Sequence, residues 1–382
     1  MKTSLVNLTL SLAALTLGLV ACTNGAEPEA TATPAADPAP LATQPIDMSA
    51  FERTVFDGAT KTEGVVVQHE GKIVYEKYAA GYDEKKRHLA YSVSKSVGSA
   101  LLGIAVEEGL VALEDSICKY IPAAKDDQTR CETKLRDVVQ MTSGLSWNES
   151  YDNPAVSNVL PMLYGDEPDT GAYAASQPRV APAGTRWAYS SGDSNILARA
   201  IRTALGGKDM RAWARERLFA PAGLSSAILE SDRSGTLLFS SGLFMTPRDM
   251  ARFGQLYLDD GMIGGKRVLP SSWVAFSKTP AAAVASPRPR TGTALGERGG
   301  SYGAAFWLNA ATPTAPTETL TYATAPNDLF CAQGNWGQRI CVVPSRKLVV
   351  VRVGNDRVGF YDVGPAVAAA VAAVDAQKTK GK

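Results

Sequence analysis

The sequence predicts an α+β protein. One antiparallel sheet is built from the N- and C-terminal segments and flanked by helices, and a helical lobe is inserted between its two halves. Two β-branched runs, at 64–69 and 73–78, surround a Glu70-Gly71 turn and indicate a β-hairpin. Strand patterns return only late in the chain, at residues 304–308, 329–332, 338–343 and 348–353. Helical periodicity dominates the residues between the two groups.

The clearest helix is expected over residues 92–110, where Val97, Leu101 and Ile104 belong to a wide apolar face. Shorter helices are expected at residues 195–204, 210–218 and 247–258, and an Ala- and Val-rich helix at about 363–376. We therefore expect one domain at 47–380. Its sheet lobe would comprise about 50–90 and 298–376, and its helical lobe about 91–297.

Composition and missing motifs exclude several classes of function. The 39 Lys and Arg residues nearly balance the 38 Asp and Glu residues, which argues against a nucleic-acid partner. Only His69 and His88 occur, neither beside a plausible nucleophile, and there is no Gly-x-Ser-x-Gly motif, so a Ser-His-Asp hydrolase is disfavoured. Phosphate-loop, Rossmann and His-Glu-x-x-His patterns are also missing. We expect no metal and no organic cofactor.

Residues 1–22 are expected to be a secretion signal, with Lys2 ahead of an apolar run too short to span a bilayer comfortably. The run ends Leu-Val-Ala-Cys, and this resembles the lipobox of bacterial lipoproteins, in which the cysteine, here Cys22, is acylated. Residues 23–46 are rich in Ala, Pro, Thr and Glu and are expected to form a disordered tether. We expect a lipid-anchored protein of the bacterial envelope, on the periplasmic face of the outer membrane because Thr23 follows the cysteine. An ordinary signal peptide is the alternative.

Export makes disulfides possible for the other four cysteines. Cys118 and Cys131 lie 13 residues apart, and Cys331 and Cys341 flank a Gly-Asn-Trp-Gly turn. Residues whose numbers sum to 672 would face each other across a turn centred on Trp336, which places Cys331 opposite Cys341. We predict bridges 118–131 and 331–341, with four free buried thiols as the alternative.

The sequence Ser92-Val93-Ser94-Lys95 carries the main chemical signal. Residues three apart share a helix face, so the Lys95 amine can approach the Ser92 hydroxyl. Burial lowers the pKa of a lysine, and the neutral amine can then take the serine proton. A solvated helix start is the alternative. The spacing recurs at Ser116 and Lys119, but Tyr-Ile-Pro follows at once and predicts that Lys119 lies on an exposed turn.

Tyr189 is a second candidate for proton transfer. It stands in Pro-Ala-Gly-Thr-Arg-Trp-Ala-Tyr-Ser-Ser (residues 182–191), ahead of the helix predicted at 195–204, and is expected on a loop tip. A phenol close to a lysine ammonium has a lowered pKa and can shuttle protons. A tyrosine that merely packs beneath a loop is the alternative.

Four ordered segments together resemble the class C β-lactamase-like serine hydrolases, a superfamily that includes penicillin-binding DD-peptidases, esterases and 6-aminohexanoate-oligomer hydrolases. The segments are residues 91–98, 135–145, 182–191 and 248–254. The resemblance covers about residues 50–376 and implies a β-lactamase/transpeptidase-like fold. It also implies that Ser92 is the acylated nucleophile, Lys95 its base and Tyr189 the proton shuttle.

The third family motif, Lys-Thr-Gly or a variant, is matched by residues 334–338, which read Gly-Asn-Trp-Gly-Gln. The resemblance implies that the backbone N–H groups of Ser92 and Gln338 form an oxyanion hole. It also places Asn335, Trp336 and Gly337 against the substrate. A second match, Arg-Thr-Gly-Thr at 290–293, lacks flanking strand character.

Two departures from the family pattern bear on the substrate. Asn335 supplies no cation for the carboxylate of a penicillin, and Ser191 stands where the Tyr-x-Asn motif has its amide. Both favour the esterase and 6-aminohexanoate-hydrolase branch, in which a tyrosine of a Tyr-x-x-Pro segment, here Tyr151, reaches the leaving amine. The alternative for Tyr151 is packing on Trp147.

The predicted function is therefore a serine hydrolase that forms an acyl-enzyme on Ser92 and cleaves small esters or amides. Two alternatives remain at this stage. One is a β-lactamase or DD-peptidase acting on penicillins or peptidoglycan, and the other is a non-catalytic envelope protein that binds ligands on the same fold.

Overall fold

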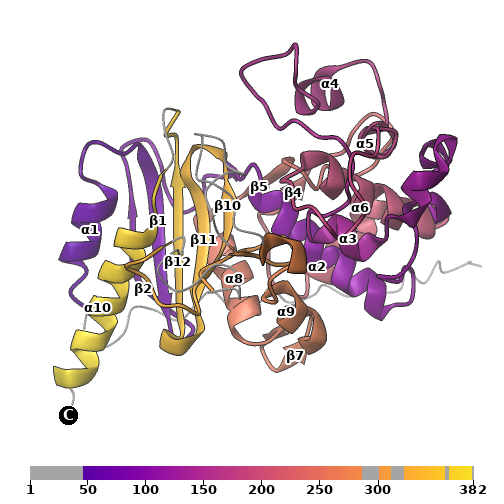
Figure 1. Ribbon diagram of the computed structural model, residues 1–382. Helices are drawn as coiled ribbons and strands as arrows, with labels where there is room; N and C mark the ends of the chain where they lie inside the picture. Colours follow the sequence, from indigo (N-terminus) through magenta and orange to yellow (C-terminus); the bar gives the residue numbers. More distant parts are fainter. Residues whose placement is uncertain (1–45, 286–300, 311–321, 358–360, 381–382) are drawn as a thin grey trace, which may run out of the picture. The chain divides into compact units, whose positions relative to one another are not determined.

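The computed structural model describes residues 46–285, 301–310, 322–357 and 361–380 (Figure 1). The predicted signal peptide, Cys22, nearly all of the predicted tether and the Arg-Thr-Gly-Thr sequence at 290–293 lie outside the described residues.

A seven-stranded antiparallel sheet joins the two ends of the chain, as predicted. Its strand order is β2-β1-β12-β11-β10-β9-β8. The strands are β1 Thr62–His69, β2 Lys72–Tyr78, β8 Ser301–Tyr302, β9 Trp307–Leu308, β10 Phe330–Gly334, β11 Gln338–Val343 and β12 Leu348–Gly354. Because β1 pairs with both β2 and β12, the N-terminal hairpin is an integral part of the C-terminal sheet.

The strand predicted at 304–308 is wrong as a single element. The chain instead forms the two-residue strands β8 and β9, which pair with each other. Between them Ala305 has φ +65°, a left-handed conformation that a continuous strand does not contain. The apolar run therefore makes a tight turn.

Helices cover both faces of the sheet (Figure 1). Helices α1 (Ser49–Val55) and α10 (Gly364–Lys380) contact each other and pack with Val65 and Val67 in one apolar cluster. Val66, which points the opposite way, belongs to the larger cluster that contains α2 (Val93–Glu107) and α8 (Pro247–Leu258). This alternation along β1 is the period of two that a strand imposes.

The remaining helices and short strands form the part of the chain between β2 and β8. The helices are α3 Leu135–Val139, α4 Val159–Tyr164, α5 Thr170–Ala175, α6 Ser191–Ala204, α7 Met210–Ala214 and α9 Ser271–Ser277. One small sheet contains β3 His88–Leu89, β4 Ile228–Leu229 and β5 Leu243–Met245. A second small sheet contains β6 Met262–Ile263 and β7 Lys266–Arg267. A π-helical turn, Arg215–Phe219, follows α7.

Helix α6 begins earlier than its apolar periodicity predicted. The hydroxyl of Ser190 accepts a hydrogen bond from the Asp193 N–H at 2.9 Å and caps the helix. The first turn is polar, reading Ser-Gly-Asp-Ser, so its hydrophobic pattern gave no signal. Ser191 is therefore the first residue of the helix. Tyr189 lies two positions before it, next to the N-cap Ser190, and is buried instead of standing at a loop tip.

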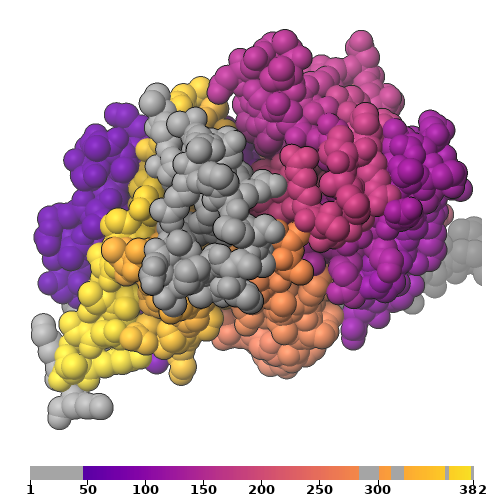
Figure 2. Space-filling model, in the orientation of Figure 1, coloured from indigo at the N-terminus to yellow at the C-terminus, as the bar shows by residue number. Residues whose placement is uncertain are grey.

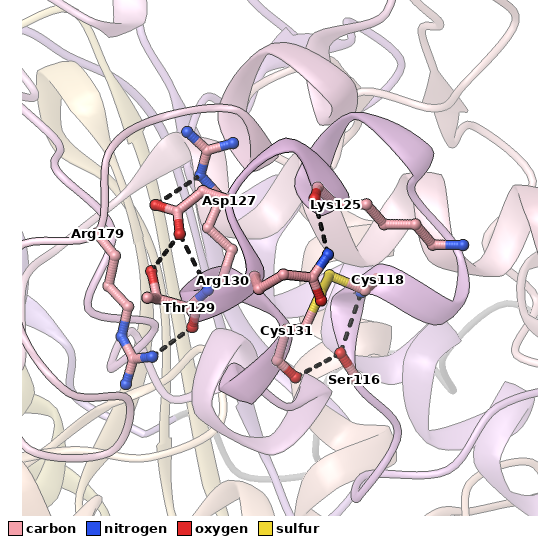
Figure 3. Close-up of a disulfide and its surroundings, with 9 residues drawn as sticks. Ser116, Cys118, Lys125, Asp127, Thr129, Arg130, Cys131 and Arg179 are labelled. Atoms are coloured by element: carbon pink, nitrogen blue, oxygen red, sulfur yellow. Dashed lines mark hydrogen bonds and ion pairs between the residues drawn. A yellow bond between two sulfur atoms is a disulfide. The ribbon is translucent and has the colours of Figure 1, made fainter.

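Both predicted disulfides are present. The Cys118–Cys131 bridge joins two short 3-10 turns, Ile117–Lys119 and Gln128–Glu132, and a third turn, Pro122–Asp126, lies between them in the chain (Figure 3). Cys331 and Cys341 face each other across β10 and β11, in the register predicted from the turn at Trp336. None of the helices in the described part of the chain combines the length and apolar character needed to cross a bilayer.

Candidate active site

Ser92 and Lys95 lie at the start of α2, one helical turn apart. Ser92 is the N-cap residue of the helix, and Lys95 Nζ donates a hydrogen bond to its Oγ at 3.1 Å. The side chain of Lys95 is held inside the protein, where only 3% of the residue is exposed. Among the described residues, no hydrogen bond uses the Ser92 backbone N–H, which is therefore free to bind a ligand oxygen at the positive end of the helix.

The Lys95 amine is surrounded by oxygen atoms without a direct carboxylate partner among the described residues. It also donates to Ser191 Oγ at 3.0 Å and to the Ser240 carbonyl at 2.8 Å. Burial lowers the pKa of Lys95 to about 8, and the negative charge of Glu149 opposes this shift. A lysine that titrates there can take up and return a proton near neutral pH.

Tyr189 lies close to both Ser92 and Lys95. Its ring stacks on Trp307 with 5.6 Å between centroids, and Lys95 Nζ lies 5.0 Å from the centre of the Tyr189 ring. Burial, followed by the charge of Glu149, raises the pKa of Tyr189, while its hydrogen bond with Ser92 acts in the opposite direction. The expectation of a lowered pKa is wrong, because burial outweighs the nearby amine. Tyr189 is therefore a neutral phenol at neutral pH.

Glu149 occupies a central place that sequence reasoning missed. Its carboxylate accepts hydrogen bonds from the Ser191 N–H at 2.9 Å and Ser191 Oγ at 2.5 Å. It also accepts from Trp147 Nε1 at 2.5 Å and Tyr151 OH at 2.7 Å. The only available signal was a carboxylate two residues before the predicted pocket residue Tyr151. A continuous network thus runs from Ser92 through Lys95 and Ser191 to Glu149.

The hairpin between β10 and β11 borders the same site. Trp336 adopts φ +56° and lies edge-on against Tyr91, with ring centroids 4.9 Å apart. Gly334 approaches the chain just before the nucleophile so closely that an added Cβ would lie 2.1 Å from the Ala90 carbonyl oxygen. In the hairpin register Gln338 pairs with Gly334, so its backbone lies close to the start of α2.

The predicted site residues therefore divide into two groups. The structure connects Ser92, Lys95, Tyr189, Ser191 and Tyr151 in one network, with Trp336 at its edge. Asn335 differs, because its side chain accepts a hydrogen bond from the Trp336 N–H and stays within the hairpin. Gly337 accepts from Arg352 at its carbonyl, and the Gln338 side chain contacts the Gly354 backbone. Within the described ranges, no three His, Cys, Asp or Glu residues are placed to hold a metal ion.

The second Ser-x-x-Lys copy is a structural element. Ser116 Oγ donates to the Cys131 carbonyl, whereas Lys119 is exposed and paired with Asp115 at 2.9 Å. The spacing alone therefore does not bring amine and hydroxyl together.

Comparison with known proteins shows the family to which the chain belongs. The Beta-lactamase family model matches residues 49–373. The 6-aminohexanoate-dimer hydrolase of Paenarthrobacter ureafaciens is 26% identical over 223 residues, 56% of this chain and 56% of that protein. The chain thus spans about half the length of this curated relative.

Two solved structures share the fold. One, from Bacillus anthracis and described as a candidate 6-aminohexanoate-dimer hydrolase, has a TM-score of 0.67 at 24% identity, covering 90% of this chain and 88% of that chain. A family VIII carboxylesterase has a TM-score of 0.66 at 16% identity, covering 88% and 99%. The chain belongs to the β-lactamase family.

Proposed function

We propose that the protein hydrolyses small esters or amides through an acyl-enzyme on Ser92, with Lys95 and Tyr189 as its proton-transfer groups. The observation that carries this proposal is the 3.1 Å contact between Ser92 Oγ and the buried amine of Lys95. A serine hydroxyl needs a base to become a nucleophile, and this amine is the base within reach.

In the acylation step, neutral Lys95 accepts the Ser92 proton while Oγ attacks the substrate carbonyl carbon. The N–H groups of Ser92 and Gln338 are proposed to bind the resulting oxyanion, assisted by the N-terminus of α2. As the tetrahedral intermediate collapses, Tyr189 donates its proton to the leaving alcohol or amine and recovers one from the Lys95 ammonium. The acyl group then remains on Ser92.

In the deacylation step, water takes the place of the leaving group. The Tyr189–Lys95 pair accepts a proton from the attacking water, and Ser92 recovers its proton when the acid product leaves. Tyr151 lies beside this path, because its hydroxyl is held by Glu149, which also holds Ser191. We propose that Tyr151 and Ser191 contact the leaving group and that Trp336 forms the wall of the pocket.

Labelling and turnover test this mechanism together. A fluorophosphonate should form a covalent adduct with the wild-type protein but not with Ser92→Ala, and intact-mass measurement detects this adduct. With p-nitrophenyl esters, Ser92→Ala should abolish turnover, and Lys95→Ala should lower kcat/KM by about two orders of magnitude or more. Ser116→Ala and Lys119→Ala repeat the same changes at the second motif and should keep wild-type rates. Wild-type turnover by Ser92→Ala would overturn the proposal.

The substrate class is proposed from the third motif. The side chain of Asn335 carries no charge and is directed to its own hairpin, so the lysine that serves a penicillin carboxylate in the family motif has no counterpart at that position. We expect nitrocefin to be hydrolysed much more slowly than a short acyl ester or a linear amide. Efficient nitrocefin turnover would instead favour a β-lactamase.

We also propose that the protein is lipid-anchored in the bacterial envelope through Cys22. Support comes from the Leu-Val-Ala-Cys sequence and from two disulfides, which are typical of an oxidising compartment. Expression with a labelled fatty acid tests this: the wild-type protein should carry the label in the membrane fraction, and Cys22→Ser should not. Equal labelling of both forms would refute the proposal.

A further inference from the structure

A pocket opens at the end of the sheet where β1 begins and β12 ends. It has a volume of about 580 Å³ and is lined by Ala59, Lys61, Thr62, Glu63, Tyr82, Asn355, Asp356 and Arg357. None of these residues takes part in the proposed acyl transfer.

The carboxylates in the lining already have partners. Glu63 accepts hydrogen bonds from Tyr82 OH at 2.7 Å and lies 2.9 Å from His88 Nδ1. Asp356 forms an ion pair with the buried Arg352 at 2.6 Å and accepts from the Lys61 backbone N–H at 2.7 Å. Both carboxylates thus have hydrogen-bond partners, and Asp356 is in addition paired with the full positive charge of Arg352.

The cations in the lining do not have such partners. Both Lys61 and Arg357 are exposed, and among the described residues no carboxylate lies within ion-pair distance of either side chain. Arg357 Nε donates to Asn355 Oδ1 at 3.1 Å. Outside the lining, Lys86 Nζ lies 4.1 Å from the centre of the Tyr82 ring. Among the described residues, the lining therefore holds two exposed cations, Lys61 and Arg357, without a carboxylate partner.

Arg357 connects this pocket to the nucleophile. Its guanidinium carbon lies 4.1 Å from the centre of the Trp336 ring, and Trp336 in turn contacts Tyr91, the residue before Ser92. An aromatic surface thus leads from the reacting serine to the cationic pocket. A guanidinium stacked on a tryptophan keeps its N–H edge available for a planar anion.

We propose that this pocket binds the terminal carboxylate of the substrate, so that the preferred substrates are esters or amides whose acyl chain ends in a carboxylate. Arg357 and Lys61 contact the carboxylate, and Trp336 supports the chain between it and the scissile bond. This inference rests on the proposed acyl transfer at Ser92.

Matched substrates test the pocket. The ratio of kcat/KM for the p-nitrophenyl monoester of hexanedioic acid to that for p-nitrophenyl hexanoate should fall about tenfold in Arg357→Gln, the effect of one charge-assisted hydrogen bond. Lys61→Gln should lower it in the same direction. Lys347→Gln removes an exposed cation at the opposite end of β12 and should keep the wild-type ratio. An unchanged ratio in Arg357→Gln would overturn the pocket assignment.

A binding measurement separates the pocket from the chemistry. Calorimetry with Ser92→Ala should detect hexanedioate, with weaker binding of hexanoate and a loss of about tenfold when Arg357→Gln is added. Added salt should weaken the hexanedioate signal, because the contacts are exposed. Arg357-dependent binding without turnover by the wild type would support the pocket and refute the proposed hydrolysis. Equal binding with and without Arg357 would refute the pocket.

Discussion

The carboxylate of Glu149 acts on Lys95 through charge and on Ser191 through two hydrogen bonds. Glu149→Gln removes the charge and keeps an oxygen acceptor, so the pKa of Lys95 should fall below its value of about 8. If neutral Lys95 is the base, activity rises as pH rises through that pKa. The acidic limb of kcat/KM should therefore move to lower pH in Glu149→Gln.

The pH profile distinguishes this role from a purely structural one. Other titratable groups lie close: Tyr189 and Tyr151, whose pKa values are raised, and Asp193, whose pKa burial raises to about 7. Asp193→Asn shows whether the acidic limb of kcat/KM reports the titration of the Asp193 carboxyl. Glu114→Gln removes an exposed carboxylate and serves as a control. A limb that stays in place in Glu149→Gln but disappears in Asp193→Asn would contradict the assignment to Lys95.

At the scale of residues, the contact between Ser92 and Lys95 was predictable, and the charge of Glu149 that acts on Lys95 was not. Ser92 and Lys95 contact each other because residues three apart share a helix face, and this spacing can be read from the sequence. Glu149 reaches Ser191 across 42 positions, so its role depends on how a loop packs against α6. The pKa of Tyr189 was mispredicted for the same reason: burial is a tertiary property.

Among the elements, the β10–β11 hairpin depends on a glycine. Gly337 has φ +87°, and an added Cβ would lie 2.0 Å from Arg352 Nη1 and 2.5 Å from Asp356 Oδ2. Both atoms belong to a buried ion pair that cannot move away freely. Gly337→Ala should therefore displace the hairpin, lower the free energy of unfolding by about 2–4 kcal/mol and reduce esterase activity.

Gly71 provides the matched control in the same sheet. It has φ +78° in the β1–β2 turn, with nothing within 4 Å of an added Cβ. Gly71→Ala should cost only the left-handed conformation, about 1 kcal/mol, and leave activity unchanged. Denaturant unfolding of both variants isolates the cost of the clash. Equal losses would mean that the ion pair relaxes around the new methyl group.

Helices and strands could be predicted where the local sequence pattern was strong. The register of β10 with β11 could be fixed in advance because a short turn determines which residues face each other. The start of α6 and the division of the apolar run into β8 and β9 could not be predicted. One depends on a polar cap and the other on a left-handed residue inside an apolar run, and hydrophobic periodicity detects neither.

For the whole molecule, the sheet topology joins segments that are far apart in the chain. Residues of β1 pair with residues of β12 nearly three hundred positions later. Periodicity predicted strands at both ends, but not that β1 would lie between β2 and β12, since pairing order depends on tertiary packing. The two cross-links, by contrast, are local and leave this long-range closure to non-covalent packing.

The two disulfides should differ in accessibility although they close loops of similar length. Cys331 and Cys341 are fully buried between the sheet and α10, whereas Cys131 is partly exposed among the 3-10 turns of Figure 3. Reductant applied to the native protein should therefore open the Cys118–Cys131 bridge first. Alkylation followed by peptide mapping reads the order directly. Earlier modification of Cys331 and Cys341 would show that the strand pair opens more readily than the turns.

The loss of loop entropy in the unfolded chain determines how much each disulfide stabilises the protein. Closing a loop of this length stabilises the folded state by about 3 kcal/mol, mainly by restricting the unfolded chain. The Cys118→Ala, Cys131→Ala double variant should lose that amount while keeping the proposed esterase activity, because the bridge joins the turns Ile117–Lys119 and Gln128–Glu132, neither of which carries a residue of the proposed acyl transfer. The Cys331→Ala, Cys341→Ala pair should lose a similar amount, and all four changes should be nearly additive. A combined loss well below the sum would mean that the two regions unfold as separate units, so that no single free energy of unfolding describes the molecule.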